Sequence, residues 1–208
     1  LPAYRVIGGG RPAGICGSGL IDLVAELFAA GIVDERGKFV ARARSPRVRS
    51  EDGVARFVVA EAGETASGKR ISLSQPDLDN LMLSKAAMYT MLTVMTEAAG
   101  VGFDELERFF IAGAFGAYVA ADKAVTIGMV PDIPLERFQL LGNSSLEGAK
   151  RVLLSVDALG EIERIGRDMT YIEMNESREF MAAFTAARFL PHTDLDRFPS
   201  VRQRLGLR

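Results

Sequence analysis

Cysteine and histidine are nearly absent from this chain of 208 residues. The single cysteine, Cys16, excludes an internal disulfide bond and a cysteine cluster that could hold zinc or an iron–sulfur centre. The single histidine, His192, follows Pro191 near the end of the chain, and we expect it at the surface without a metal role. The sequence therefore predicts no cysteine- or histidine-based metal centre within these residues.

Long apolar runs and a strong net charge are also lacking. No run approaches the roughly 20 apolar residues that span a bilayer, and residues 1–4 do not begin a signal peptide. The net charge is −2, and the arginines within residues 42–49 are followed by Glu51 and Asp52. We therefore expect a cytoplasmic protein that binds neither nucleic acid nor a membrane.

Glycine, in contrast, is concentrated at residues 13–19, directly before a helical apolar pattern over residues 18–30. A glycine loop that opens a helix favours phosphate binding, because the backbone can approach an oxyanion closely and free N–H groups point at it. The hydroxyl of Ser18 would add a donor. The alternative interpretation is a turn that only connects two elements.

The next part of the sequence predicts an antiparallel meander and then a long helix. Polar residues at 41–53 and 62–69 are expected to form exposed loops between the strands. Ser74 and Asp77 form a capping pattern for a helix that ends before Gly100. We expect the methionines of this helix in the core. The predicted strands lie at 38–40, 56–60 and 70–73.

Strands and helices alternate in the second half, which predicts a parallel arrangement. The strand at 108–112 is expected to be buried, the next strand lies at 138–141, and Ser144 and Glu147 form a capping-box pattern. The fold class is therefore α/β, a ribonuclease-H-like layer with a mixed sheet flanked by helices. It would occupy residues 1–190, before a polar tail at 191–208 that has no core pattern. The other expected elements are helices near 104–107, 120–127, 145–155, 159–167 and 176–189 and a strand at 171–174.

Two further glycine loops directly follow the apolar strands, at residues 113–116 and 142–143. In open α/β sheets, ligands bind at the carboxyl ends of strands, where such loops gather. Together with residues 14–19, these loops favour a nucleotide, which has phosphates at one end and a flat base at the other. Each loop alone is equally explained by a tight turn.

Two polar side chains near these motifs have competing interpretations. Lys85 lies in the middle of the long predicted helix, on a largely apolar side. It is either a surface lysine with a buried stem or a charge that points into a cleft. Cys16 is interpreted as a small packed residue without a lowered thiol pKa and without a redox role.

Five motifs occur in a fixed order along residues 5–190. In this combination the chain resembles the C-terminal region of the reductive activators of corrinoid proteins, which are ATP-dependent iron–sulfur proteins. The resemblance implies an actin-like ATPase fold, in which ATP with Mg²⁺ binds between two ribonuclease-H-like lobes. The motifs are residues 14–20, Gln75 and Asp77 with Lys85, residues 111–116, residues 127–131 and residues 142–149.

The resemblance also implies roles for single residues, although it identifies no catalytic base. The phosphate loop would comprise Gly14, Gly17, Ser18 and Gly19, and the adenosine loop Gly113, Ala114, Phe115 and Gly116. Asn143, in the second connecting motif, is a further nucleotide candidate. Gln75, Asp77 and Lys85 are candidate cleft residues, and their alternative role is a helix cap with a surface charge.

The chain departs from the full-length relatives in two ways. It has no four-cysteine [2Fe–2S] domain, and no Asp-x-Gly-[Ser/Thr] loop precedes Gly14. The resemblance therefore implies the second lobe of a larger activator, whose cluster lies in another region. That activator would use ATP hydrolysis to reduce Co(II) to Co(I) on the corrinoid protein of a methyltransferase system, as a monomer or homodimer. The alternatives are a kinase-like relative, an activator of 2-hydroxyacyl-CoA dehydratases, and a non-catalytic dimerisation or docking domain.

Overall fold

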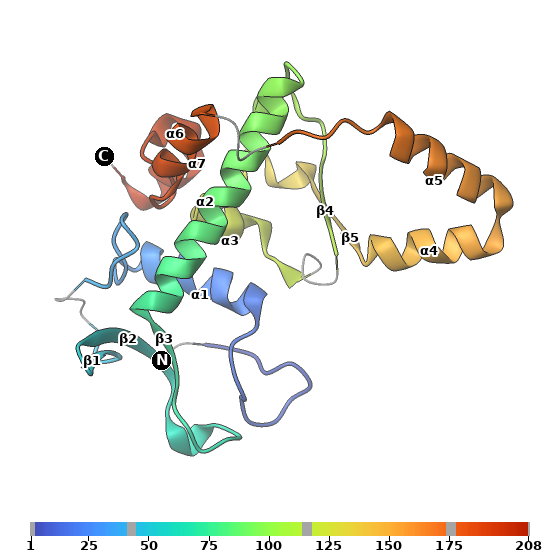
Figure 1. Ribbon diagram of the computed structural model, residues 1–208. Coiled ribbons are helices and arrows are strands. Elements are labelled where there is room, and N and C mark those ends of the chain that lie inside the picture. Colours follow the sequence, from blue (N-terminus) through green and yellow to red (C-terminus); the bar gives the residue numbers. More distant parts are fainter. Residues whose placement is uncertain (1–2, 41–44, 114–117, 174–177, 208) are drawn as a thin grey trace.

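The first sheet is a three-stranded antiparallel meander, as the sequence predicts. The computed structural model describes residues 3–40, 45–113, 118–173 and 178–207 (Figure 1). The sheet has the order β1, β2, β3, and the buried Phe57 and Leu73 pair across its last two strands. Its strands are β1 (Val48–Glu51), β2 (Val54–Ala60) and β3 (Ile71–Ser74).

Two details of the meander differ from the predictions. Residues 41–53 were expected to form a loop, but Val48 pairs with Phe57 and begins β1, because the side chains of Val48 and Phe57 contribute to the apolar core. The strand predicted at 38–40 is reduced to a single bridge between Phe39 and Val33. Residues 41–44 lie outside the described ranges.

The second sheet consists of β4 (Phe109–Ala112) and β5 (Phe138–Gly142), which run parallel with Phe109 opposite Phe138. The parallel arrangement is confirmed. The expectation that the strand at 108–112 is buried is wrong, because one face of the sheet packs on the core through Phe109 and Phe138 while Phe110 on the other face remains about half exposed. Within the described ranges, the strands thus form two sheets rather than one mixed sheet.

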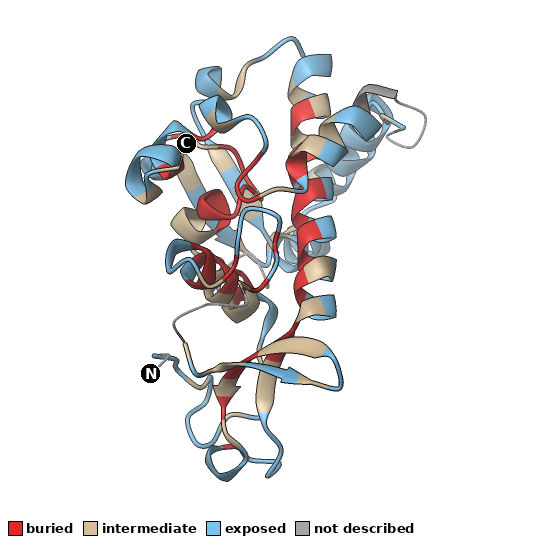
Figure 2. Ribbon diagram, turned by 90° about the vertical axis from the view of Figure 1, so that its left-hand side faces the viewer, coloured by how far each residue is buried: buried red, intermediate tan, exposed pale blue. Residues whose placement is uncertain are grey.

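Helix α2 (Gln75–Ala98) runs through the middle of the molecule and carries a stripe of buried side chains along one side (Figure 2). Its predicted cap is confirmed: the N–H of Asp77 donates to the Ser74 hydroxyl, and the N–H of Ser74 donates to the Asp77 carboxylate at 3.0 Å. The buried residues of the helix are Leu78, Leu81, Met82, Lys85, Ala86, Tyr89, Thr90 and Thr93.

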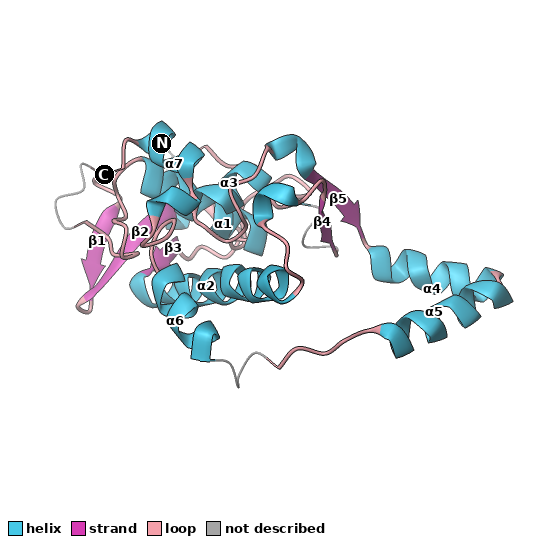
Figure 3. Cartoon of the chain, turned by 90° about the horizontal axis from the view of Figure 1, so that it is seen from above, coloured by secondary structure: helices cyan, strands magenta, loops and turns pink. Residues whose placement is uncertain are grey.

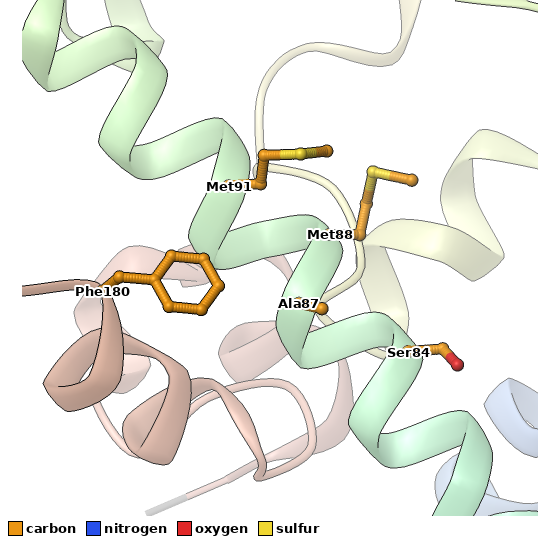
Figure 4. A pocket seen from close by; sticks show the side chains of 5 residues that line it. All are labelled: Ser84, Ala87, Met88, Met91 and Phe180. Atoms are coloured by element: carbon orange, nitrogen blue, oxygen red, sulfur yellow. The ribbon is translucent and has the colours of Figure 1, made fainter. Parts of the chain in front are cut away.

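Most methionines of α2 do not lie in the core, contrary to expectation. Met82 is buried, but Met88, Met91 and Met95 are 41%, 37% and 48% exposed. Met88 and Met91 line a shallow cavity of about 280 Å³ together with Phe180 (Figure 4). Helical spacing identified the apolar positions correctly, but it could not show which of them another element covers.

Shorter helices pack around α2 and complete the core. Helix α1 contacts α3, and α6 packs along α2, where the rings of Phe180 and Phe184 stack at 6.1 Å as the spacing predicts. These helices are α1 (Gly17–Ala29), α3 (Ala121–Thr126), α6 (Arg178–Ala187) and α7 (Pro199–Leu205). Short 3₁₀ turns lie at Ala62–Glu64, Phe103–Glu105, Leu135–Arg137 and Leu195–Arg197.

The residues after Pro191 belong to the core, so the expectation of a polar tail without a core pattern is wrong. Phe198 and Val201 have no exposed surface, and the ring of Phe198 lies 5.2 Å from that of Tyr89 on α2. These two apolar side chains, at the cap and in the first turn of a short helix, gave too weak a periodic signal to be recognised among the charged residues around them.

Helices α4 (Ser144–Leu154) and α5 (Val156–Asp168) form a hairpin that stands away from the rest of the molecule (Figures 1 and 3). Asn143 caps α4 by accepting the N–H of Leu146 at 3.1 Å, so the predicted Ser144–Glu147 capping box is wrong. Residues 171–173 form no strand, and Met174 lies outside the described ranges. Among the described residues, no helix is both long and apolar enough to cross a membrane.

Candidate functional site

The predicted phosphate loop leads into the N-terminus of α1, where a cysteine caps the helix. The N–H of Gly19 donates to the sulfur of Cys16 at 3.4 Å, and the Ser18 hydroxyl lies 3.5 Å from the same sulfur. The N–H of Leu20 donates to the Cys16 carbonyl and begins the helical ladder. The N–H groups of Gly17 and Ser18 donate to no other described residue, so the first turn keeps donors that could meet an anion.

The glycines of this loop serve two different purposes. A Cβ atom at Gly14 would meet nothing within 4 Å, so the space beside this residue is open. A Cβ at Gly19 would lie 3.3 Å from the Cys16 sulfur, so this glycine lets the thiol reach its N–H. Gly14 therefore meets the steric condition for a close approach of ligand to backbone, whereas the cap alone explains Gly19.

Cys16 differs from its predicted role as a packed residue with an unperturbed thiol. It is exposed, and hydrogen bonds from the Ser18 hydroxyl and then from the Gly19 N–H lower its thiol pKa. Helix caps are usually Ser, Thr, Asp or Asn, and Cys16 stands at the cap position of α1. Its place just before the predicted helix could have indicated from the sequence that its thiol caps α1.

An aspartate that the sequence analysis did not single out lies on the same helix. Asp22 is four residues after Ser18, one helical turn along the same face. Its Oδ1 atom is buried and accepts no hydrogen bond from the described residues. Burial raises the pKa of this carboxyl group, while Lys123 of α3 opposes that rise. An unsatisfied buried carboxylate oxygen next to a predicted phosphate loop is a candidate ligand of a cation.

The carboxyl ends of β4 and β5 meet, as the parallel arrangement predicts. The N–H of Gly113 donates to the carbonyl oxygen of Gly142 at 2.7 Å, and both glycines have positive φ angles, 101° and 64°. The amide oxygen of Asn143 is used by the cap of α4. The carboxyl end of β4 and the N-terminal end of α1 lie on the same side of the molecule (Figure 1). Ala114, Phe115 and Gly116 lie outside the described residues.

Lys85 is fully buried, so both interpretations of this residue are wrong. Its ammonium donates to the carbonyl oxygens of Phe189 and Pro191, each at 2.6 Å, and to that of Gly128 at 3.3 Å. Three backbone acceptors match the three donors of an ammonium group. Desolvation lowers the pKa of Lys85 to about 7. The residue ties α2 to two distant loops and does not face a cleft.

Gly128 and His192 complete the surroundings of Lys85. Gly128 has a φ of +70°, and a Cβ here would overlap the carbonyl oxygen of Pro191. His192 was expected at the surface but is buried, with its ring 5.5 Å from that of Tyr89. Its Nδ1 accepts the N–H of Asp194, and burial, followed by the nearby Arg197, lowers its pKa to about 4. This imidazole is therefore neutral at pH 7.

Gln75 and Asp77 have structural partners in the described chain. The Gln75 amide donates to the Gly37 carbonyl at 2.8 Å and accepts the N–H of Phe39 at 3.1 Å, which fixes the turn that precedes Phe39. Asp77 caps α2. The contact of Asp77 is the helix cap of the alternative interpretation, while the assignments of the glycine loops to a nucleotide stay predictions.

Comparison with known proteins identifies the family. The family described as the C-terminal domain of RACo, the ASKHA domain, matches residues 1–202. The chain belongs to this family. A solved structure, the reductive activator for corrinoid, iron–sulfur protein, is 42% identical and superposes with a TM-score of 0.90 over 95% of this chain and 32% of that chain. The RACo C-terminal family thus accounts for the fold.

Two curated relatives of the family are similar over most of this chain. The corrinoid activation enzyme RamQ of Eubacterium limosum is 35% identical over 188 residues, which are 87% of this chain and 32% of that protein. The [Co(II) methylated amine-specific corrinoid protein] reductase of Methanosarcina barkeri is 23% identical over 162 residues, 78% of this chain and 26% of that protein. The chain spans about a third or less of the length of these relatives.

Proposed function

We propose that this RACo-type C-terminal domain is the part of an ATP-dependent activator that contacts the nucleotide, and that the whole protein reduces a corrinoid protein from Co(II) to Co(I). The single observation that carries the proposal is the first turn of α1, whose first N–H groups donate to no other described residue. This turn directly follows a glycine loop and lies on the same side of the molecule as the carboxyl end of β4. The names of the relatives, two corrinoid activators and a Co(II) corrinoid reductase, support it.

The residues present fit a nucleotide with magnesium. The N–H groups of Gly17 and Ser18 would hold phosphate oxygens, and the open side of Gly14 would let a phosphate approach. Gly113, at the end of β4, would lie against adenosine. Asp22, through its unpaired Oδ1, would hold the magnesium ion. Bound ATP supplies free energy that shifts the protein between two arrangements with different affinity for its partner.

These residues do not fit an iron–sulfur cluster. The chain has one cysteine, and that thiol caps α1. A [2Fe–2S] cluster with four cysteine ligands would belong to another region of the longer protein. The remaining parts of the proposal are a corrinoid partner from a methyltransferase system and a cytoplasmic location. A kinase-like activity is less favoured, because none of the relatives named above is a kinase.

Gly14→Val in the full-length protein tests the nucleotide assignment. The structure leaves room for a Cβ here, so the variant should fold normally and lose ATP affinity by at least tenfold, measured by calorimetry. Gly63→Val is the matched control, because a Cβ at Gly63 also meets nothing within 4 Å and the residue lies in a turn between β2 and β3.

Three outcomes of this experiment are informative. Loss of ATP affinity in Gly14→Val alone, together with loss of ATP-dependent Co(II) reduction followed by corrinoid absorbance, supports the proposal. Normal ATP affinity in Gly14→Val contradicts the phosphate assignment. Absence of ATP binding by the unmodified full-length protein would favour the non-catalytic docking role instead.

A further inference from the structure

The α4–α5 hairpin carries an apolar surface that no other described element covers. Neither helix contains a buried residue, and the two helices contact mainly each other. At the tip of the hairpin, Leu153, Leu154 and Val156 are 86%, 87% and 85% exposed. We call the following residues the hairpin surface: Leu146, Leu153, Leu154, Val156, Leu159, Ile162, Ile165 and Met169.

Interactions within the hairpin are too weak to keep its two helices folded in water. The helices have 11 and 13 residues, a length at which isolated helices are marginal even with favourable sequences. Their ion pairs, such as Arg164 with Asp168 and Lys150 with Glu147, are exposed and contribute about 0.3–0.5 kcal/mol each. The apolar side of α5 repeats at Leu159, Ile162 and Ile165, which is the pattern of a helix packed on one side.

The solved relative is a chain about three times as long as this one. Its superposition covers 95% of this chain with a TM-score of 0.90, which leaves about ten residues unmatched. The two helices together contain more residues than that, so the matched region includes most of the hairpin, and about two thirds of the relative's chain lies outside the matched region. Exposed apolar surface of this extent marks an interaction site.

We propose that the hairpin surface packs against a folded region of the same longer polypeptide, outside residues 1–208. This region would present an apolar face, and its margin would carry both signs of charge, because the polar side of the hairpin carries both acidic and basic residues. Docking within one polypeptide loses no translational freedom, which suits a surface built from only two short helices. The inference does not depend on nucleotide binding.

Photo-crosslinking in the full-length protein tests this inference. Ile162 is replaced by a photoreactive phenylalanine derivative, and a matched protein carries the same group at Glu163, about 100° further around the helix. Each is mixed with an isotopically heavy copy and irradiated, and the cross-linked peptides are identified by mass spectrometry. We expect position 162 to cross-link to a peptide outside residues 1–208 of its own polypeptide, at least tenfold more than position 163.

Hydrogen exchange supplies the second readout. In the full-length protein, amides of α5 should exchange at least 100-fold more slowly than in an unstructured peptide, at every protein concentration. Ile162→Lys should reduce that protection at least tenfold while leaving α2 protected, and Glu163→Lys should change it less than twofold. Fast exchange of α5, protection that rises with protein concentration, cross-links to the heavy copy, or cross-links only with added corrinoid protein would each overturn the inference.

Discussion

The ammonium nitrogen of Lys85 lies 2.6 Å from the carbonyl oxygen of Pro191, a residue 106 positions further along the chain. The same nitrogen binds the carbonyl oxygens of Phe189 and Gly128. One buried cation thus joins α2, the end of α3 and the segment after α6. We expect this cluster to control the stability of the domain and its dependence on pH.

Lys85→Met should lower the free energy of unfolding by about 3 kcal/mol, because it leaves three buried carbonyl groups without a donor. Denaturant titration followed by circular dichroism measures the change. Lys38→Met is the control: Lys38 pairs with Asp79 at the surface, and its loss should cost less than about 1 kcal/mol. Equal stability of the two variants would contradict the structural role of Lys85.

The pKa values of Lys85 and His192 predict how stability depends on pH. Burial lowers the folded pKa of Lys85 to about 7 from its ordinary value of 10.5, so between these values the unfolded chain binds more protons and stability rises with pH. The folded pKa of His192 is about 4, below 6.5, so its contribution is complete above pH 6.5 and is lost as the pH falls through 4. Melting temperatures between pH 4 and 10 measure both windows. His192→Gln should flatten only the acidic one.

Gly128→Ala should be more destabilising than Gly100→Ala. Both glycines have nearly the same positive φ, 70° and 68°, so both substitutions meet backbone strain of about 1 kcal/mol. At Gly100 a Cβ meets nothing within 4 Å, whereas at Gly128 it overlaps the Pro191 carbonyl next to Lys85. We expect at least twice the loss at Gly128 by thermal unfolding. Similar losses would show that the Pro191 segment moves away easily.

Asp77→Ala should destabilise α2 without weakening the binding of ATP. Because Asp77 and Ser74 cap α2 together, Asp77→Ala and Ser74→Ala should each cost about 1 kcal/mol and leave ATP affinity within twofold. Chemical denaturation and calorimetry on the full-length protein measure the two effects. A tenfold loss of ATP affinity in Asp77→Ala alone would place this carboxylate in the cleft instead.

Cys16 should react faster with iodoacetamide at pH 7 than an ordinary cysteine, because the Ser18 hydroxyl and the Gly19 N–H lower its thiol pKa. Ser18→Ala should slow the reaction. Since Cys16 adjoins the proposed phosphate loop, ATP with Mg²⁺ should protect the thiol in the full-length protein. Mass spectrometry of the Cys16 peptide measures the rate, and an unchanged rate with ATP would contradict the proposed nucleotide position.

Local signals in the sequence predicted the elements that have local causes. The glycine loop before α1, the Ser74 cap of α2 and the parallel strands before Gly113 and Gly142 were all identified from neighbouring residues. The errors concern which side of an element is covered. Lys85 and His192 each contact a residue about 100 positions away in the sequence, Lys85 with Pro191 and His192 with Tyr89, and no local pattern reports such contacts.

The candidate site likewise contains features that the sequence predicted and features that it did not. The role of Cys16 was predicted wrongly and Asp22 was missed, since their roles depend on the direction of a thiol and on an unsatisfied oxygen, which only coordinates reveal. The family resemblance, which combined five separate motifs, is confirmed by the match over residues 1–202. The assignments of single residues to phosphate and adenosine stay predictions.

The contacts of Lys85 also bear on the order in which this domain can fold during synthesis. A ribosome releases α2 long before it releases Pro191, so the lysine of the nascent helix must stay hydrated while more than a hundred further residues are made. Contacts this distant in sequence close late, because a long loop must first be ordered. A chain that stops short of Phe189 would therefore leave a solvated cation in its interior, and its core would stay open.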